Sequence, residues 1–127
     1  MKNVNKIKLD FLHLKKGSKV LDIGCSYGEQ AMGIAKQGII VYGIDSSSKL
    51  IKKFKLRAKQ ANLKCYGILA DATKMPFETN YFDAIVATEV FEHIPNVKKV
   101  IDESFRVLSP RGRACISVPS KISEEIF

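Results

Sequence analysis

Residues 20–28, VLDIGCSYG, carry two signals that together indicate the fold class. The stretch begins as a short apolar run, which is typical of a buried strand, and it ends in a turn that contains two glycines. The next segment, 28–38, has Glu29 in its first turn and Gly38 at its end, which predicts a helix. A buried strand, a glycine turn and a helix in succession form the start of a βαβ unit.

Apolar and amphipathic segments alternate along the rest of the chain in the same way. Besides the strand at 18–24, the pattern predicts strands at 39–45, 64–71, 82–90 and 113–119, helices at 4–14, 46–63 and 95–108, a loop at 72–81 and a turn at 109–112. Strands that alternate with helices of this length pair in parallel and carry helices on both faces. The sequence therefore predicts the α/β class, with a doubly wound, Rossmann-like and mostly parallel sheet of about five strands.

Length and composition indicate one soluble globular domain. The chain has 127 residues, of which 46% are hydrophobic and 27% charged, and these fractions are ordinary for such a domain. No apolar run reaches the roughly 18 residues that cross a bilayer, and the Lys-rich start lacks the apolar core of a signal peptide, so we expect a cytoplasmic protein. Cys25, Cys65 and Cys115 lie far apart without metal-ligand spacing, which predicts neither a disulfide framework nor a metal site. Cys25 lies at a helix start, where a thiol pKa can fall.

Basic residues are concentrated in two segments. Residues 1–20 hold six lysines and one acid, residues 49–64 hold seven basic residues and no acid, and the net charge is +8. Such segments suit nucleic acid, anionic lipid or an acidic substrate, but a solvated helix face is the more common explanation. Because aromatic residues do not alternate with these charges, there is no clear nucleic-acid signal.

Ligands of doubly wound sheets bind beyond the carboxyl ends of the strands. The residues expected there are Asp22 to Gly28, Asp45, Asp71 and Thr88 to His93. Asp45 closes the second strand, where a carboxylate accepts hydrogen bonds from ribose hydroxyls. A dinucleotide fits poorly, because Glu29 stands where the fingerprint G-x-G-x-x-G has its third glycine and Asp22 would repel a pyrophosphate. S-adenosylmethionine carries an adenosine and positive charge without phosphate, and it suits these carboxylates.

With these motifs in this order, the sequence resembles the class I S-adenosylmethionine-dependent methyltransferases of the small-molecule type, a group that includes quinone-ring methylases. The resemblance runs from about residue 18 to residue 119. Residues 20–28 are similar to the family's first motif, D-x-G-x-G-x-G. The later motifs are matched by VYGIDSS at 41–47, ILADATKMPF at 68–77, FDAIVATEVFEHI at 82–94 and RVLSPRGRACISVP at 106–119. Five motifs at the family's spacing make the resemblance specific, although each alone is weak.

The resemblance implies a cofactor site and a catalytic pair. Asp45 would bind the ribose, Asp71 would meet the adenine amino group, and the backbone of Ala72 would offer a further contact. His93 would act as a general base, while Glu92 would orient its imidazole or contact the substrate. The full set of implied cofactor contacts is Asp22, Gly24, Ser26, Gly28, Asp45, Ser46, Asp71, Ala72 and Glu89.

Structural roles remain open as alternatives. Asp45 would cap the following helix, and Asp71 would cap its own loop. The Glu92–His93 pair would only precede the next helix. Met75 and Phe77 would fill the core instead of flanking an adenine ring.

The sequence departs from the family pattern at three points. Ser26 replaces the middle glycine of the first motif, and Arg111 replaces a glycine of a later turn. The chain also ends before the last two strands and a helix of the family's usual sheet, so the single domain at 1–127 would be truncated at its C-terminus. The fifth strand would then be an exposed edge, unless a homodimer that pairs these edges or a tail covers it.

Two functions follow from this reading. The first is an S-adenosylmethionine-dependent methyltransferase that transfers a methyl group to a small-molecule acceptor by in-line displacement. The alternative is a non-catalytic module that binds S-adenosylmethionine or S-adenosylhomocysteine, or a fragment that needs a partner chain. A nucleotide-binding oxidoreductase is disfavoured by the turn spacing and by Asp22.

Overall fold

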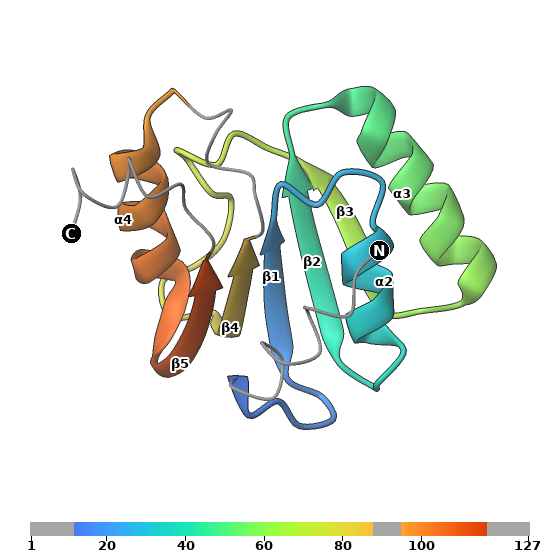
Figure 1. The fold of residues 1–127 in the computed structure, drawn as a ribbon, viewed down its shortest axis with the longest axis horizontal. Helices are drawn as coiled ribbons and strands as arrows, with labels where there is room; N and C mark the ends of the chain where they lie inside the picture. Colours follow the sequence, from blue (N-terminus) through green and yellow to red (C-terminus); the bar gives the residue numbers. More distant parts are fainter. Residues whose placement is uncertain (1–11, 88–94, 117–127) are drawn as a thin grey trace.

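The computed structural model describes residues 12–87 and 95–116 (Figure 1). Its elements are β1 (Lys19–Ile23), α2 (Glu29–Ala35), β2 (Ile40–Asp45), α3 (Ser48–Ala61), β3 (Cys65–Leu69), β4 (Phe82–Ala87), α4 (Val97–Val107) and β5 (Leu108–Ile116). The strands form one sheet in the order β3-β2-β1-β4-β5, and each neighbouring pair is parallel. The chain reverses its direction of winding between β1 and β4, which confirms the doubly wound α/β fold and puts the switch point beside β1.

Helices cover both faces of the sheet, as expected for parallel strands (Figure 1). On one face α2 and α3 pack over a buried cluster that includes Val20 and Phe54. On the other face α4 packs over a cluster that includes Leu21, Ile85 and Val100. Because side chains alternate along a strand, neighbouring residues of β1 belong to opposite clusters and the strand is buried on both sides.

The turn expected at 109–112 is the main difference between the predicted and observed elements. It lies within β5, which follows α4 directly. The pairing with β4 shifts register there, from Phe82 with Leu108 to Ala84 with Arg113, so the intervening residues form an irregularity in the strand. Arg111 has no positive φ, so this position does not require the glycine that the family usually has.

Several sequence predictions fall on residues outside the described ranges. These are most of the helix expected at 4–14, the end of the fourth strand after Ala87, and the end of the fifth strand after Ile116. Glu89, Glu92 and His93 also lie outside the described residues. Within the described part of the chain, no helix is both long and apolar enough to cross a membrane.

Candidate functional site

The turn after β1 has the backbone conformation that its glycines predict. Gly24, Ser26 and Gly28 have φ values of 70°, 55° and 89°, all in the left-handed region. The N–H groups of Gly24 and of the next residue donate to the Ile44 carbonyl at 2.8 and 2.9 Å, which fixes the turn against β2. A β-carbon at Gly28 would lie 2.7 Å from the Phe54 ring, so this position has no room for a side chain. Ser26, which stands where the family motif has a glycine, thus has a left-handed φ that glycine adopts readily.

Asp45 links this turn to the start of α3. Its Oδ2 accepts a hydrogen bond from the Ser26 N–H at 2.9 Å, and its Oδ1 accepts one from the Ser47 N–H at 3.0 Å. The helix cap itself is Ser47, whose hydroxyl oxygen accepts from the Leu50 N–H at 3.2 Å. Asp45 is thus not the N-cap of α3. It positions the glycine turn and the helix entry relative to each other, with Ser46 exposed beside it.

Asp22 is a buried carboxylate with one unsatisfied oxygen. The residue is 2% exposed, and its Oδ1 accepts a hydrogen bond from Gln30 Nε2 at 3.2 Å. Its Oδ2 is buried and has no hydrogen-bond partner among the described residues. The pKa of Asp22 is raised to about 7, mainly by burial and in smaller part by the nearby charge of Asp45, against the opposing effect of the Gln30 hydrogen bond. A buried acceptor without a partner is costly, so the geometry favours a ligand that brings a donor or a positive charge.

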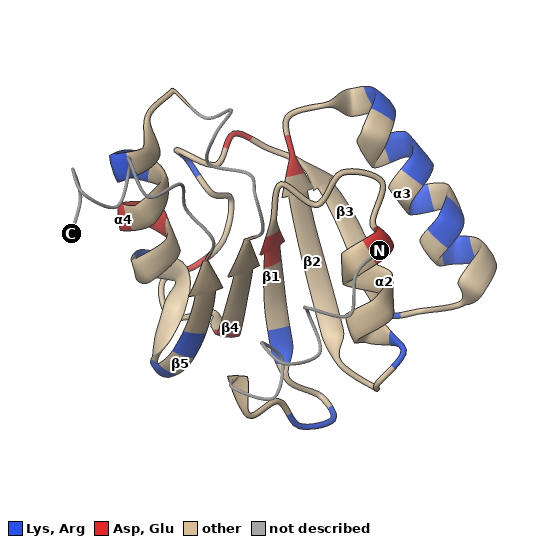
Figure 2. Cartoon of the chain, viewed as in Figure 1, with Lys and Arg blue, Asp and Glu red and all other residues tan. Residues whose placement is uncertain are grey.

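Asp71 follows β3 at the same edge of the sheet and is exposed. Its Oδ1 accepts hydrogen bonds from the N–H and the hydroxyl of Thr73 at 2.9 and 2.7 Å. These bonds hold the pKa of Asp71 below its ordinary value. The carboxylate therefore caps its own loop, as the structural alternative predicts, and Ala72 lies within that turn. Figure 2 shows acidic segments at the carboxyl ends of β1 and β2, the edge at which the glycine turn lies.

Other side chains outside the glycine turn and its carboxylates have structural roles. Met75 is only 4% exposed and belongs to the core beneath α4, and Phe77 packs in an aromatic cluster on the same face. The core interpretation therefore accounts for both. Asp83 accepts a hydrogen bond from the Lys19 N–H at 2.8 Å, at the amino end of β1. Burial is the largest effect on the Cys25 thiol and raises its pKa, so the helix start does not activate it.

A clamp between α4 and the loop after β3 was not apparent from the sequence. The Arg106 guanidinium donates to Glu103 at 2.6 and 3.0 Å and to the carbonyls of Met75 and Phe77 at 3.0 and 2.9 Å. Glu103 in turn accepts from the Met75 N–H at 2.8 Å. The sequence held one local signal of this clamp, because Glu103 and Arg106 are an acid and a base three residues apart on a predicted helix. The clamp fixes the loop that begins at Asp71.

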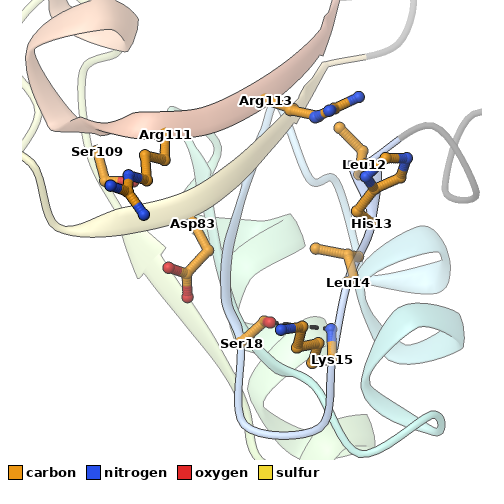
Figure 3. Close-up of a pocket in the computed structure, with 9 residues that line it drawn as sticks. All are labelled: Leu12, His13, Leu14, Lys15, Ser18, Asp83, Ser109, Arg111 and Arg113. Carbon is orange, nitrogen blue, oxygen red and sulfur yellow. Dashed lines mark hydrogen bonds between the residues drawn. The ribbon is translucent and has the colours of Figure 1, made fainter.

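A cavity of about 340 Å³ lies away from the glycine turn and from Asp22, Asp45 and Asp71 (Figure 3). Its lining includes Ser18, just before β1, and Asp83, near the start of β4, so it is at the amino end of these strands. Doubly wound sheets bind their ligands at the opposite, carboxyl end. The glycine turn and its carboxylates therefore form the candidate site. Among the residues described, no group of three or more His, Cys, Asp or Glu side chains is placed to hold a metal ion.

Comparison with known proteins agrees with this geometry. Residues 21–116 match a family model described as a methyltransferase domain. A ubiquinone biosynthesis O-methyltransferase of Xylella fastidiosa is 31% identical over 118 residues, which are 90% of this chain and 48% of that protein. A botryococcene C-methyltransferase of Botryococcus braunii is 38% identical over 103 residues, which are 79% of this chain and 27% of that protein.

A solved structure supports the fold. The crystal structure of a SAM-dependent methyltransferase from Aquifex aeolicus matches with a TM-score of 0.81 at 24% identity, over 90% of this chain and 62% of that one. The chain spans half the length or less of these curated relatives, 48% for the Xylella protein, 50% for one from Coxiella burnetii and 27% for the Botryococcus protein. The matched residues 21–116 include every described strand apart from the first residues of β1. The chain therefore belongs to the methyltransferase-domain family, which confirms the resemblance in its motifs.

Proposed function

We propose that this chain binds S-adenosylmethionine at the carboxyl ends of β1 and β2 and serves a methyltransferase that acts on a small molecule. The observation that carries the proposal is the buried Asp22, whose Oδ2 has no hydrogen-bond partner among the described residues. An ionised carboxylate in that position is stabilised by a cationic group and destabilised by a phosphate. Family membership supports the same cofactor.

Each residue of the site has a separate part in this proposal. Bound S-adenosylmethionine supplies a methyl group that its sulfonium already activates for transfer. Asp22 would attract the positively charged part of the cofactor, and Asp45 would accept hydrogen bonds from the ribose hydroxyls. The turn from Gly24 to Gly28 brings the backbone close to the ligand, as left-handed glycines allow. Asp71 and Ala72 would contact the adenine, with Ser46 and Glu89 completing the contacts.

Catalysis then depends mainly on position. The chain must hold the acceptor atom on the axis of the transferred methyl group, about 3 Å away, with water excluded. We propose His93 as the base for an acceptor that must lose a proton, and Glu92 as the group that orients it. The two relatives are named as an O-methyltransferase and a C-methyltransferase, so they support a small organic acceptor without selecting the atom that is methylated.

The alternative function is a binding module or a fragment that needs a partner chain. The chain covers 48% of a relative named as an O-methyltransferase, so the activity of this chain by itself has to be measured. We also propose a homodimer that pairs the β5 edges as one arrangement of such a chain. We also propose a cytoplasmic location for the protein, whichever of the two functions holds, and cell fractionation would test this location.

Calorimetry tests the cofactor assignment directly. The chain is titrated with S-adenosylhomocysteine, S-adenosylmethionine and NAD. We expect the first two to bind and NAD not to bind, and binding of NAD alone would overturn the assignment. Methyl transfer from labelled S-adenosylmethionine to a panel of phenols, amines and alkenes then distinguishes an enzyme from a binding module.

A further inference from the structure

The outer face of α3 carries positive charge that is not balanced locally. The helix has six cations and no acid, namely Lys49, Lys52, Lys53, Lys55, Arg57 and Lys59. Its opposite side, with Ile51, Phe54 and Ala58, is buried against the sheet. Figure 2 shows the basic segments repeated along the whole length of α3.

One apolar side chain lies in the middle of these charges. Leu56 is 57% exposed, although its size and character suit the core. Residues three or four positions apart are neighbours on a helix surface, so Lys52 and Lys53 flank Leu56 on one side and Lys59 flanks it on the other. Lys49 lies one further turn along the same side. We call Lys49, Lys52, Lys53, Leu56 and Lys59 the basic face.

No described carboxylate neutralises this face. Within residues 12–87 and 95–116 the ion pairs join Lys98 to Asp102 and Arg106 to Glu103, and both pairs are on α4. Among the described residues, Tyr27 is the partner that α3 cations share: Lys53 Nζ lies 4.7 Å and the Arg57 guanidinium carbon 5.0 Å from the centre of its ring, and Arg57 also donates to the Tyr27 carbonyl at 3.3 Å. An aromatic ring leaves their charge in place. Alternating positive and negative charges would indicate a solvent-exposed face with salt bridges, and α3 has no acid to alternate with its cations.

We propose that the basic face docks on an anionic lipid surface. Clusters of at least four Lys or Arg on a helix attract acidic phospholipids, and each adds to the attraction within a Debye length of the surface. An exposed Leu in the centre of such a cluster gains from contact with the apolar edge of the lipid interface. Single-stranded RNA fits less well, because proteins bind its bases by stacking them on aromatic side chains, and none of the five residues of the basic face is aromatic. The proposal does not depend on methyl transfer.

Vesicle sedimentation tests the proposal on the full chain. Binding to phosphatidylcholine vesicles with phosphatidylglycerol is compared with binding to phosphatidylcholine alone. The test variant combines Lys49→Gln, Lys52→Gln and Lys59→Gln, and the control combines Lys36→Gln, Lys74→Gln and Lys99→Gln. The control removes the same net charge from exposed positions outside α3. Thermal melting of both variants checks that they fold.

We expect the test variant to need about 100-fold more acidic lipid for half-binding, and the control to change much less. Leu56→Ser, which keeps every charge, should weaken binding by about fivefold and so report contact with the apolar interface. Raised salt should release the wild-type chain. If the test variant does not fold, Lys52→Glu and Leu56→Ser are measured singly.

Three outcomes would overturn the proposal. The first is equal binding to neutral and acidic vesicles. The second is an equal loss in the test and control variants, which would show a general charge effect. The third is RNA binding that the test variant loses while its vesicle binding is unchanged, which would make RNA the partner of this face.

Discussion

Ser26 and Asp45 join the two sides of the candidate site: the Ser26 N–H donates to Asp45 Oδ2 at 2.9 Å. The other oxygen of Asp45 accepts from Ser47 at 3.0 Å, so both backbone segments orient the carboxylate. An ionised carboxylate has about four acceptor positions, so two remain for the hydroxyls of a ribose. The residue predicted to bind the cofactor is therefore also one that shapes the turn around it.

Replacing Asp45 should affect both binding and folding. We expect Asp45→Ala to weaken S-adenosylhomocysteine binding by about 1.5–3 kcal/mol, because a charge-assisted contact is lost. It should also lower the free energy of unfolding by about 1–3 kcal/mol, because two backbone N–H groups lose their acceptor. The control is Asp83→Ala, which removes a carboxylate from the Lys19 N–H at the opposite end of the sheet. Equal loss of affinity in both variants, measured by calorimetry, would show that Asp45 acts only through stability.

Stability without ligand should fall as the pH rises toward neutrality. The pKa of Asp22 is about 7 in the folded chain against an ordinary value of 3.8, so the folded state binds its proton more tightly. Between these two values the folded state therefore holds more protons than the unfolded state, and stability declines with pH by up to ~4 kcal/mol. Asp22→Asn should remove this decline. Unfolding by urea from pH 4 to pH 8 measures it, and parallel curves for the two proteins would contradict the assignment to Asp22.

The same variant should lose affinity for the cofactor. A cation lowers the pKa of a neighbouring carboxyl, so binding near pH 7 should release a proton from Asp22. Calorimetry in buffers of different ionisation enthalpy detects that proton in the wild type. We expect Asp22→Asn to release none and to bind about 10- to 100-fold more weakly at pH 8. A variant that is more stable at pH 8 but binds as well as the wild type would argue against a cationic ligand at this carboxylate.

Gly28 should tolerate no side chain. Its φ is 89°, and an added β-carbon would lie 2.7 Å from Phe54, so Gly28→Ala should cost at least about 2 kcal/mol in thermal unfolding. Gly33 is the matched control, because it lies within α2 and an added β-carbon there meets no atom within 4 Å. Gly33→Ala should stabilise the helix by about 0.5–1 kcal/mol. Equal effects at both positions would refute the packing argument.

The clamp on the loop after β3 should contribute more than a surface ion pair. Arg106→Met removes the donor to two loop carbonyls and leaves Glu103 without its Arg106 partner. We therefore expect the free energy of unfolding to fall by about 1–3 kcal/mol. Lys98→Met breaks an exposed pair, with side chains 79% and 65% exposed, and should change stability by less than about 0.5 kcal/mol. Hydrogen exchange at the Met75 amide should accelerate in the Arg106 variant alone. Unchanged exchange there would mean that the clamp does not hold the loop.

His93→Ala tests the proposed base. Turnover should fall about 100-fold or more while cofactor affinity, measured by calorimetry, stays the same. The control is His13→Ala, at the other histidine of the chain and near the amino end of the sheet. Full activity in the His93 variant would remove this residue from the mechanism.

The sequence predicted the elements of the site more accurately than their contacts. The periodicity of 18–45 predicted β1, α2 and β2 to within a few residues, because it reports which side of each element faces the core. The carboxyl-end rule likewise placed Asp22 and Asp45 beside the glycine turn. The periodicity of the sequence did not predict the irregularity in β5, because this irregularity arises from pairing with β4.

The order of strands and helices, the glycine turn and the family were determined by the sequence alone, because hydrophobic spacing and left-handed glycines are local properties of the chain. The hydrogen-bond partners and the burial of each carboxylate follow instead from tertiary contacts. Asp71 accepts from Thr73 through Oδ1, Asp45 accepts from two backbone segments, and Asp22 keeps one buried oxygen without a partner among the described residues. Burial and hydrogen-bond partners depend on which distant segments meet, and residue spacing does not report those meetings.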